Sequence, residues 1–289
     1  MTLKCLVTGA SGLLGSAIAE RMSQEMTVVG CGHQNAYEGV RCDLRDPSAV
    51  HTLVDRVSPD VVIHAAAYKD PDFCEANQEE ARRMNVGATQ NLCDALPPET
   101  PLIFISSDYV FDGESQPNTE ASSRGAINVY GETKIASEDI VAQRPHGLSL
   151  RVPVLIAGGA SLETSGYVGQ LIACVREKTP ITLDHYHVRY PTWTHDVADV
   201  IAFLVRHGTT GVIHYSGEEA STRYEGALEA ARVLGTSSAH ILPSEGSVPR
   251  GAPRPHNSAL STQKLRSLGY SRFTPFSQVI RSVADSFPA

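Results

Sequence analysis

Residues 7–15 read Val7-Thr8-Gly9-Ala10-Ser11-Gly12-Leu13-Leu14-Gly15. They follow the apolar run Cys5–Val7, and they lead into Ser16–Arg21, whose pattern is typical of a helix. A strand, a glycine turn and a helix in this order are the context that a dinucleotide-binding fingerprint requires. The first glycine permits the tight turn, the second lets backbone N–H groups approach a pyrophosphate, and the third lets helix and strand pack closely. A glycine-rich turn in another kind of α/β protein is the alternative interpretation.

The composition excludes several classes of protein. The 289 residues include 24 basic and 32 acidic side chains, which gives a net charge of −8. This balance argues against a nucleic-acid partner and against an anionic membrane surface. No apolar run is long enough to span a bilayer. The first residues enter a strand at once, which is why we expect a cytoplasmic protein. The six scattered cysteines form no Cys-x-x-Cys pair, so we expect free thiols and no metal site.

Short apolar runs and helical patterns alternate through the first half of the chain. This alternation predicts βαβ units and therefore a doubly wound parallel sheet with helices on both faces, an α/β fold of the Rossmann type. We expect a dinucleotide-binding domain over residues 1–152, to which residues 194–217 return, and a smaller substrate-binding lobe formed mainly by residues 153–289. The predicted strands are Leu3–Thr8, Thr27–Gly30, Val40–Cys42, Val61–His64, Leu102–Ser106, Leu148–Val152 and Gly211–Ser216, and the helices of the first half are Leu13–Gln24, Pro47–Val57, Gln78–Ala95 and Val129–Gln143.

Three residues combine into a candidate catalytic set. Ser107 lies at the end of the fifth predicted strand, at the sheet edge where ligands bind in open parallel sheets. Tyr130 and Lys134 are four residues apart on a predicted helix, so they share one face. Taken alone, the Tyr-x-x-x-Lys pair also fits a solvated helix face. The order of glycine turn, strand-end serine and Tyr-x-x-x-Lys favours the catalytic interpretation.

The chemistry that this set suggests is the reduction of a carbonyl group. Reduction needs a hydride at carbon and a proton at oxygen, and Tyr130 is our candidate for the proton donor. An ammonium group near a phenol stabilises the phenolate, so we expect Lys134 to lower the pKa of Tyr130 and to orient the cofactor. Ser107 would polarise the carbonyl oxygen.

With these motifs the chain resembles the extended short-chain dehydrogenase/reductases, and within them the dTDP-4-dehydrorhamnose reductase branch. Other stretches are similar to the regulatory β subunits of methionine adenosyltransferase, which belong to that branch. The resemblance rests on residues 8–15, 42–46, 64–67, 85–92, 106–113, 130–134 and 254–260, and for the β subunits on residues 29–32, 183–185, 189–192 and 196–198. Two stretches depart from the reductases: Arg151–Leu155 lacks their aromatic residue, and residues 69–72 replace their acidic stretch.

The resemblance implies a set of cofactor contacts. Asp43 and Leu44 would flank the adenine, Ala65, Ala66, Ala67 and Tyr68 would line the path of the cofactor, and Asn85 would support the active site. Val152, Pro153 and Val154 would close over the nicotinamide. Together with Tyr130, Lys134 and the residues of the glycine turn, Gly9, Ser11, Gly12, Leu13 and Leu14, these form the expected binding set.

The residues after the second strand bear on the choice of cofactor. NAD enzymes of this fold place an acidic residue there, on the ribose 2′-hydroxyl. Here the strand runs into Gly32-His33-Gln34-Asn35, and Glu38 comes too late. We therefore expect NADP(H) rather than NAD(H), with His33 or Arg41 near the 2′-phosphate.

The leading hypothesis is an NADPH-dependent reductase of a ketone or imine in a small polar metabolite. The first alternative is a non-catalytic NADP-binding subunit that pairs with methionine adenosyltransferase, and the second is a nucleotide-sugar 4-keto reductase. A homodimer is compatible with the resemblance. Of the remaining polar residues, His64 is expected to be a packed core histidine, Asp108 to cap a turn, and Arg189 or Arg254 to meet an anionic substrate group.

Overall fold

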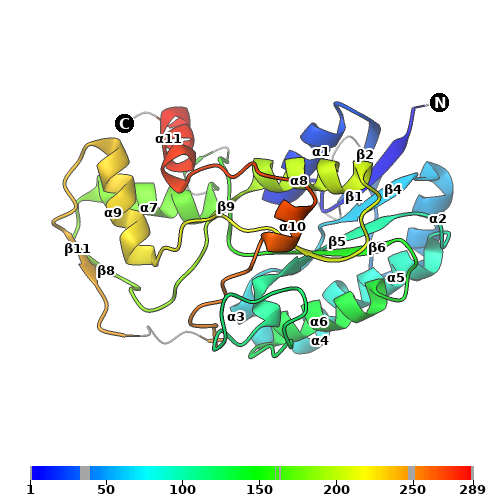
Figure 1. The fold of residues 1–289 in the computed structure, drawn as a ribbon, viewed down its shortest axis with the longest axis horizontal. Helices are drawn as coiled ribbons and strands as arrows, with labels where there is room; N and C mark the ends of the chain where they lie inside the picture. The colour runs from blue at the N-terminus through cyan, green and yellow to red at the C-terminus, as the bar shows by residue number, and fades with distance from the viewer. Residues whose placement is uncertain (1, 33–39, 160, 163, 247–250, 288–289) are drawn as a thin grey trace.

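The computed structural model describes residues 2–32, 40–159, 161–162, 164–246 and 251–287. Within them a seven-stranded sheet, parallel throughout, runs in the order β10-β6-β5-β4-β1-β2-β3 (Figure 1). The chain places β2 and β3 on one side of β1, and then returns to place β4, β5, β6 and β10 on the other side. This change of side between β1 and β4 confirms the predicted doubly wound sheet. Its strands are β1 (Lys4–Thr8), β2 (Thr27–Gly32), β3 (Val40–Arg41), β4 (Val61–His64), β5 (Leu102–Ser107), β6 (Gly147–Val152) and β10 (Gly211–His214).

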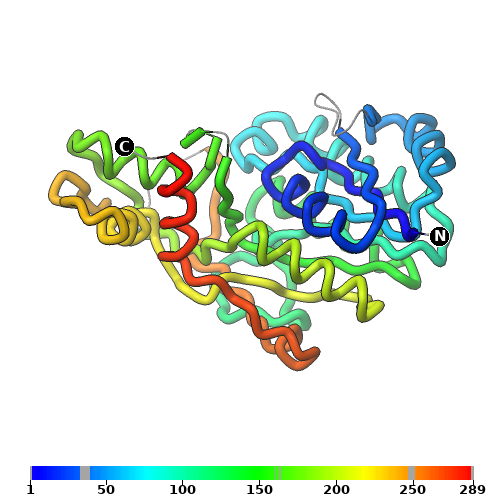
Figure 2. The backbone as a smooth tube through the Cα atoms, turned by 90° about the horizontal axis from the view of Figure 1, so that it is seen from above, coloured from blue at the N-terminus to red at the C-terminus, as the bar shows by residue number. Residues whose placement is uncertain are grey.

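Helices cover both faces of the sheet (Figure 2). Successive side chains of a strand point to opposite faces, so each strand packs against both layers of helices. On one face Cys5 and Val7 pack with α1 (Leu13–Met22) and α8 (Thr194–Arg206). On the other face Leu6 packs with helices that include α2 (Pro47–Val57) and α5 (Ala88–Ala95), and α6 (Val129–Val141) lies beside α5. The near-continuous burial of β4, β5 and β6 follows from being covered on both sides.

One predicted helix is divided in the structure. The pattern over Gln78–Ala95 predicts a single helix, whereas the chain forms α4 (Gln78–Arg82), a π-helical turn η1 (Arg83–Gly87) and then α5. Hydrogen-bond slips of this kind are common near functional sites, because they redirect a side chain. Here the π turn contains the buried Asn85.

A second, smaller lobe lies at the opposite end of the molecule from the N-terminus (Figure 1). It has a core of its own, in which α7 (Gly166–Glu177), α9 (Arg223–Leu234) and α11 (Phe276–Ser286) pack together with β8 (Ile181–Leu183) and β11 (Ile241–Pro243). The division between domains at residue 152 stays a prediction. The remaining elements are α3 (Pro71–Ala76), η2 (Asp108–Val110), β7 (Leu155–Ile156), β9 (Thr192–Trp193) and α10 (Gln263–Ser267).

Candidate active site

The larger of two adjoining cavities lies between the carboxyl ends of the strands and the C-terminal lobe, and it measures about 660 Å³. This volume is in the range of small-molecule and cofactor sites. A smaller cavity of about 280 Å³ continues from it beyond the glycine turn, toward the ends of β2 and β3. The two share Gly9, Ser11, Ala66, Ala67 and Met84, so together they form one cleft that is long enough for an extended ligand.

The glycine turn brings the backbone of the chain close to this cleft. Gly9 has φ +68°, and a Cβ there would lie 2.8 Å from the Ala66 nitrogen. A Cβ on Gly15 would lie only 2.1 Å from the Gly9 oxygen, so only glycine lets α1 approach the turn. No side chain caps the N-terminus of α1 at Gly12. Its first N–H groups are therefore open to the cavity, the arrangement that binds phosphates at helix N-termini.

The smaller cavity holds the residues expected around the adenine. Asp43, Leu44 and Tyr68 line it, as does Arg45, which the sequence analysis did not single out. Arg45 holds both carboxylate oxygens of Asp43, with Nε and Nη2 at 2.9 and 2.8 Å, and it also pairs with Glu80. Of the two residues expected near the 2′-phosphate, His33 lies outside the described residues, and Arg41 ends β3 without being among the residues that line the smaller cavity.

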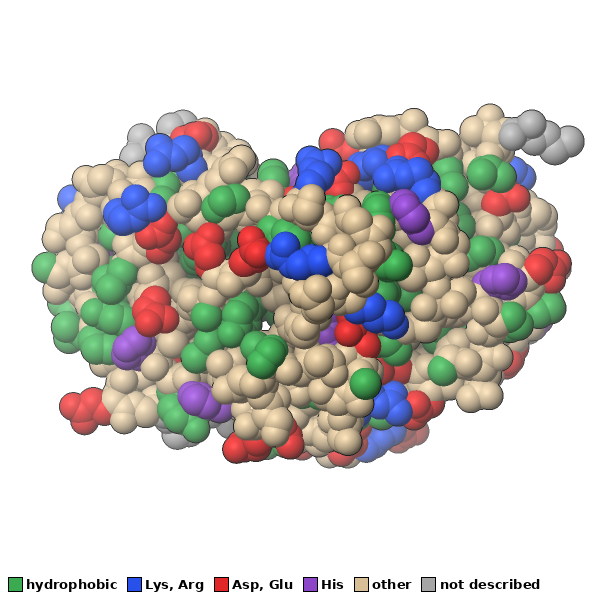
Figure 3. Space-filling view, in the orientation of Figure 1, with side chains coloured by type: hydrophobic (Ala, Val, Ile, Leu, Met, Phe, Trp, Pro, Cys, Tyr) green, Lys and Arg blue, Asp and Glu red, His purple; other side chains and the backbone are tan. Residues whose placement is uncertain are grey.

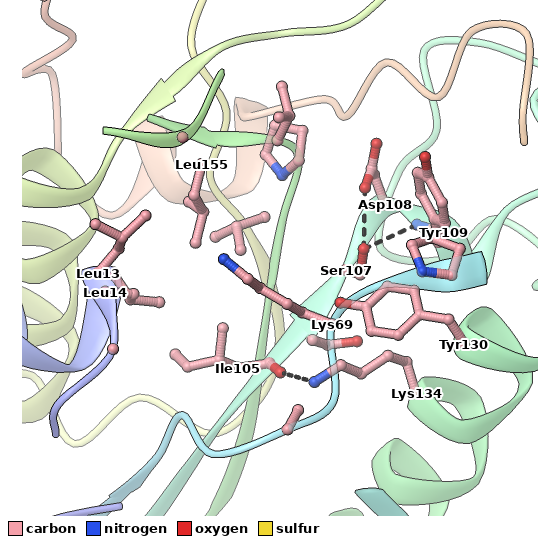
Figure 4. Close-up of a pocket in the computed structure, with 18 of the residues that line it drawn as sticks. Leu13, Leu14, Lys69, Ile105, Ser107, Asp108, Tyr109, Tyr130, Lys134 and Leu155 are labelled. Carbon is pink, nitrogen blue, oxygen red and sulfur yellow. Dashed lines mark hydrogen bonds between the residues drawn. The ribbon is translucent and has the colours of Figure 1, made fainter. Parts of the chain in front are cut away.

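The three predicted catalytic residues meet in the large cavity (Figure 4). Ser107 comes from the end of β5 and lines the same cavity as Tyr130. The Lys134 ammonium lies 5.7 Å from the centre of the Tyr130 ring and donates a hydrogen bond of 2.8 Å to the Ile105 carbonyl. The i, i+4 spacing on α6 therefore brings the phenol and the ammonium to one side of the cavity, as the sequence pattern predicts.

The electrostatics of this group differ from the expectation in one respect. We expect from the sequence that the Lys134 ammonium lowers the pKa of Tyr130. In the structure burial raises that pKa instead, and the main effect that opposes the rise is the nearby Ser107 hydroxyl. Burial also lowers the pKa of Lys134 to about 8, against a weaker opposing effect of Glu138. The loss of water around the Tyr130 phenol therefore outweighs the charge of Lys134, and the same burial also disfavours that charge. Tyr130 is therefore a phenol at neutral pH, the form that can donate a proton.

The other predicted residues divide into two groups. Asn85 does not line either cavity: it is buried, and its side chain accepts from the Tyr68 N–H at 2.8 Å and donates to the Tyr68 carbonyl at 3.0 Å. It therefore acts on the cleft by fixing the loop after β4. Of the residues expected to bind the cofactor, those that line the large cavity are Gly9, Ser11, Gly12, Leu13, Leu14, Ala65, Ala66, Ala67, Val152, Pro153 and Val154.

The cavity also has polar residues that the sequence analysis missed or left open. Lys69 reaches across it and forms no hydrogen bond or ion pair with the described residues (Figure 4). Arg189 and Arg223 line its C-terminal side, and Tyr167 has a buried hydroxyl that finds no hydrogen-bond partner among the residues that the structure describes. Arg254 is held by Asp72, with two N–H···O contacts of 2.9 Å. These residues come from loops and from helices distant in sequence, so no local spacing relates them.

His64 is a core histidine, as predicted. Its ring contacts the hydroxyls of Thr8 and Thr89 at 2.7 and 3.2 Å, and burial lowers its pKa to about 3. In the part of the chain that the structure describes, no group of three or more His, Cys, Asp or Glu side chains is placed to hold a metal ion. No described helix combines the length and the apolarity that crossing a membrane would need. Acidic and basic side chains are interspersed on the face seen in Figure 3.

Comparisons with known proteins agree with this geometry. The family model described as RmlD substrate binding domain matches residues 3–288. The β subunit of methionine adenosyltransferase 2 from Rattus norvegicus is 37% identical, over 94% of this chain and 84% of its own length. A probable dTDP-4,6-dihydroxy-2-methyloxan-3-one 4-ketoreductase from Streptomyces antibioticus is 29% identical, over 99% of this chain and 95% of its own.

Among solved structures, a dTDP-4-dehydrorhamnose reductase from Clostridium acetobutylicum superposes with a TM-score of 0.88 at 27% identity, covering 98% of this chain and 99% of that one. The match therefore extends over both the sheet and the C-terminal lobe. The chain belongs to the RmlD substrate-binding domain family of extended short-chain dehydrogenase/reductases.

Proposed function

We propose that the protein is an NADPH-dependent reductase of a ketone or imine in a small polar molecule. One observation carries the proposal: Ser107, Tyr130 and Lys134 face the same cavity as the open N-terminus of α1. A dinucleotide whose pyrophosphate lies on that helix would extend its nicotinamide toward the Tyr130 phenol. Bound NADPH supplies the hydride.

The residues of the chain then have separate roles. Tyr130, kept protonated by its burial, donates a proton to the substrate oxygen. Ser107 holds that oxygen and stabilises the charge that develops on it. Lys134 is fixed by the Ile105 carbonyl beside the phenol and is placed to hold the cofactor. Val152, Pro153 and Val154 line the cavity and would lie against the nicotinamide.

NADP(H) is the proposed cofactor because the sequence has no acidic residue directly after β2. Asp43, the carboxylate lining the smaller cavity, is occupied by Arg45, which offsets its repulsion of a phosphate. Titration with both cofactors tests this choice. Tighter binding of NADH than of NADPH would contradict it.

The reductase proposal is tested by following NADPH oxidation against a panel of ketones and imines that includes dTDP-4-keto sugars. Tyr130→Phe is expected to lower kcat by about 10²-fold or more, the usual contribution of a positioned acid, with little change in the Kd of NADPH. Tyr270→Phe is the matched control, because it also removes a buried tyrosine hydroxyl, one without a hydrogen-bond partner and outside the cavity. Full turnover by Tyr130→Phe would refute the mechanism.

A second candidate function is that of a subunit that binds methionine adenosyltransferase. The 37% identity to the rat β subunit over 94% of the chain favours it. We expect a stable complex of defined stoichiometry in co-purification and size-exclusion chromatography if this role holds. NADPH oxidation without such a complex favours the reductase, whereas a complex without NADPH oxidation favours the subunit.

A further inference from the structure

Asp108 is a buried carboxyl group beside the proposed catalytic residues, and the mechanism above leaves it without a role. It directly follows β5, is 3% exposed and lines the large cavity. Each of its oxygens meets a hydroxyl: the Ser107 hydroxyl donates to Oδ1 at 3.0 Å, and the Ser258 hydroxyl donates to Oδ2 at 2.5 Å. No lysine or arginine of the described chain forms an ion pair with it. The expectation that Asp108 caps a turn is wrong: Ser107 is the side chain that caps η2, and the Asp108 oxygens accept from two serine hydroxyls instead.

The hydroxyl of Ser107 has a single proton, and this creates a conflict. Its oxygen accepts the Tyr109 N–H at 3.2 Å, and its proton is donated to Asp108 (Figure 4). To polarise a substrate carbonyl, Ser107 has to donate its proton to the carbonyl oxygen. An ionised carboxylate only accepts hydrogen bonds, so ionised Asp108 would keep the Ser107 proton for itself.

A protonated Asp108 removes the conflict. The Ser258 hydroxyl occupies Oδ2, so the acidic proton belongs on Oδ1, which faces Ser107. Asp108 can then donate to the Ser107 oxygen, and the Ser107 proton is free to point at the substrate. The proton of Asp108 stays where it is during reduction, because hydride comes from the cofactor and the transferred proton comes from Tyr130.

The surroundings of Asp108 favour the protonated form. Burial raises its pKa, although the two serine hydroxyls and the charge of Arg189 act in the opposite direction. The other titratable groups that face it are the phenols of Tyr109 and Tyr130, which are neutral at physiological pH since burial raises the pKa of each.

We propose that Asp108 is a positioning residue that, as a neutral carboxylic acid held by Ser258, turns the Ser107 hydroxyl toward the substrate. The inference rests on the proposed reductase function. It links the C-terminal segment that carries Ser258 to the catalytic edge of the sheet, because loss of the Ser258 contact frees Oδ2 to receive the acidic proton.

The test compares the pH profile of kcat/KM for reduction in the wild type, Asp108→Asn and Asp108→Leu. In the wild type kcat/KM is expected to fall as Asp108 ionises with rising pH. The Asp108→Asn amide donates at every pH, so the part of that limb caused by Asp108 disappears, and only the loss that follows from deprotonation of Lys134, whose pKa is about 8, remains. Asp108→Leu cannot donate and is expected to lose about 10²-fold in kcat, as for one lost oxyanion donor, with the Kd of NADPH unchanged. Ser258→Ala is a milder change than Asp108→Leu, and it is expected to shift the high-pH decline in kcat/KM to a different pH.

Two results would overturn the proposal: an unchanged high-pH limb in Asp108→Asn, or wild-type kcat in Asp108→Leu. A readout that does not need turnover is the ¹³C NMR titration of aspartate carboxyl groups, in which the Asp108 signal is assigned by its absence from Asp108→Asn. We expect it to titrate above the ordinary aspartate range, and a carboxylate ionised throughout would also refute the idea. If the wild type oxidises no NADPH with any carbonyl compound, the proposed function fails, while the NMR titration still decides the protonation state of Asp108.

Discussion

Replacement of Lys134 by methionine is expected to stabilise the fold while it abolishes activity. Burial lowers the pKa of Lys134 from 10.5 to about 8, which corresponds to about 3 kcal/mol disfavouring the charged form in the folded state. The side chain is 4% exposed, so this cost is not relieved by solvent. The hydrogen bond to Ile105 offsets about 1–2 kcal/mol of it. Lys134→Met should therefore raise the free energy of unfolding by about 1–2 kcal/mol at pH 7.

The sign of the pH dependence follows from the same shift. Above pH 8 the folded state releases the Lys134 proton while the unfolded chain still holds it, so stability rises with pH until about 10.5. Relative to Lys134→Met, the wild type should gain about 2.5 kcal/mol between pH 7 and pH 10. Urea unfolding at several pH values measures this difference. Lys264→Met is the matched control, because Lys264 also donates to a carbonyl, that of Val212, but is exposed. A constant difference between wild type and Lys134→Met across this range would refute the reasoning.

Three further predictions concern the sheet and its ends. Gly15→Ala should destabilise the fold by about 3 kcal/mol and abolish NADPH binding, because the new Cβ meets the Gly9 oxygen at 2.1 Å; normal binding in a fluorescence titration would contradict this. Arg151→Met should cost about 3–5 kcal/mol in urea unfolding, because it leaves the buried Glu138 without its two closest N–H donors, at 2.7 and 2.8 Å, and a loss below 1 kcal/mol would show that the pair is not buried. His64 should remain neutral between pH 5 and 8 in histidine NMR, since burial lowers its pKa to about 3, and a titration near pH 6 would refute its burial.

The parallel sheet could be predicted because its signals are local. Each strand of the first half is a short apolar run, and each helix begins with a recognisable pattern, such as Asp46 and Pro47 at the start of α2. The glycine turn and the Tyr-x-x-x-Lys pair are also local patterns. Their meeting in one cavity follows from a general property of parallel sheets, which collect their carboxyl ends at one edge.

What the sequence did not reveal depends on contacts between distant segments. The π turn at Arg83–Gly87 has no pattern of its own, and the structure relates it to the hydrogen bonds that Asn85 makes with Tyr68. Helix α9 and strands β8 and β11 were missed because the hydrophobic core that they share forms only when the lobe assembles. The raised pKa of Tyr130 was missed for a related reason: charge spacing along a helix is visible in a sequence, whereas the loss of water around the phenol is not.

The most direct test of the account is the crystal structure of the protein with NADPH bound. We expect the pyrophosphate on the N–H groups at the start of α1, the nicotinamide against Val152–Val154, and its reactive C4 on the side of the cavity that holds the Tyr130 hydroxyl. A dinucleotide bound elsewhere, or a nicotinamide ring turned away from Tyr130 and Ser107, would contradict it.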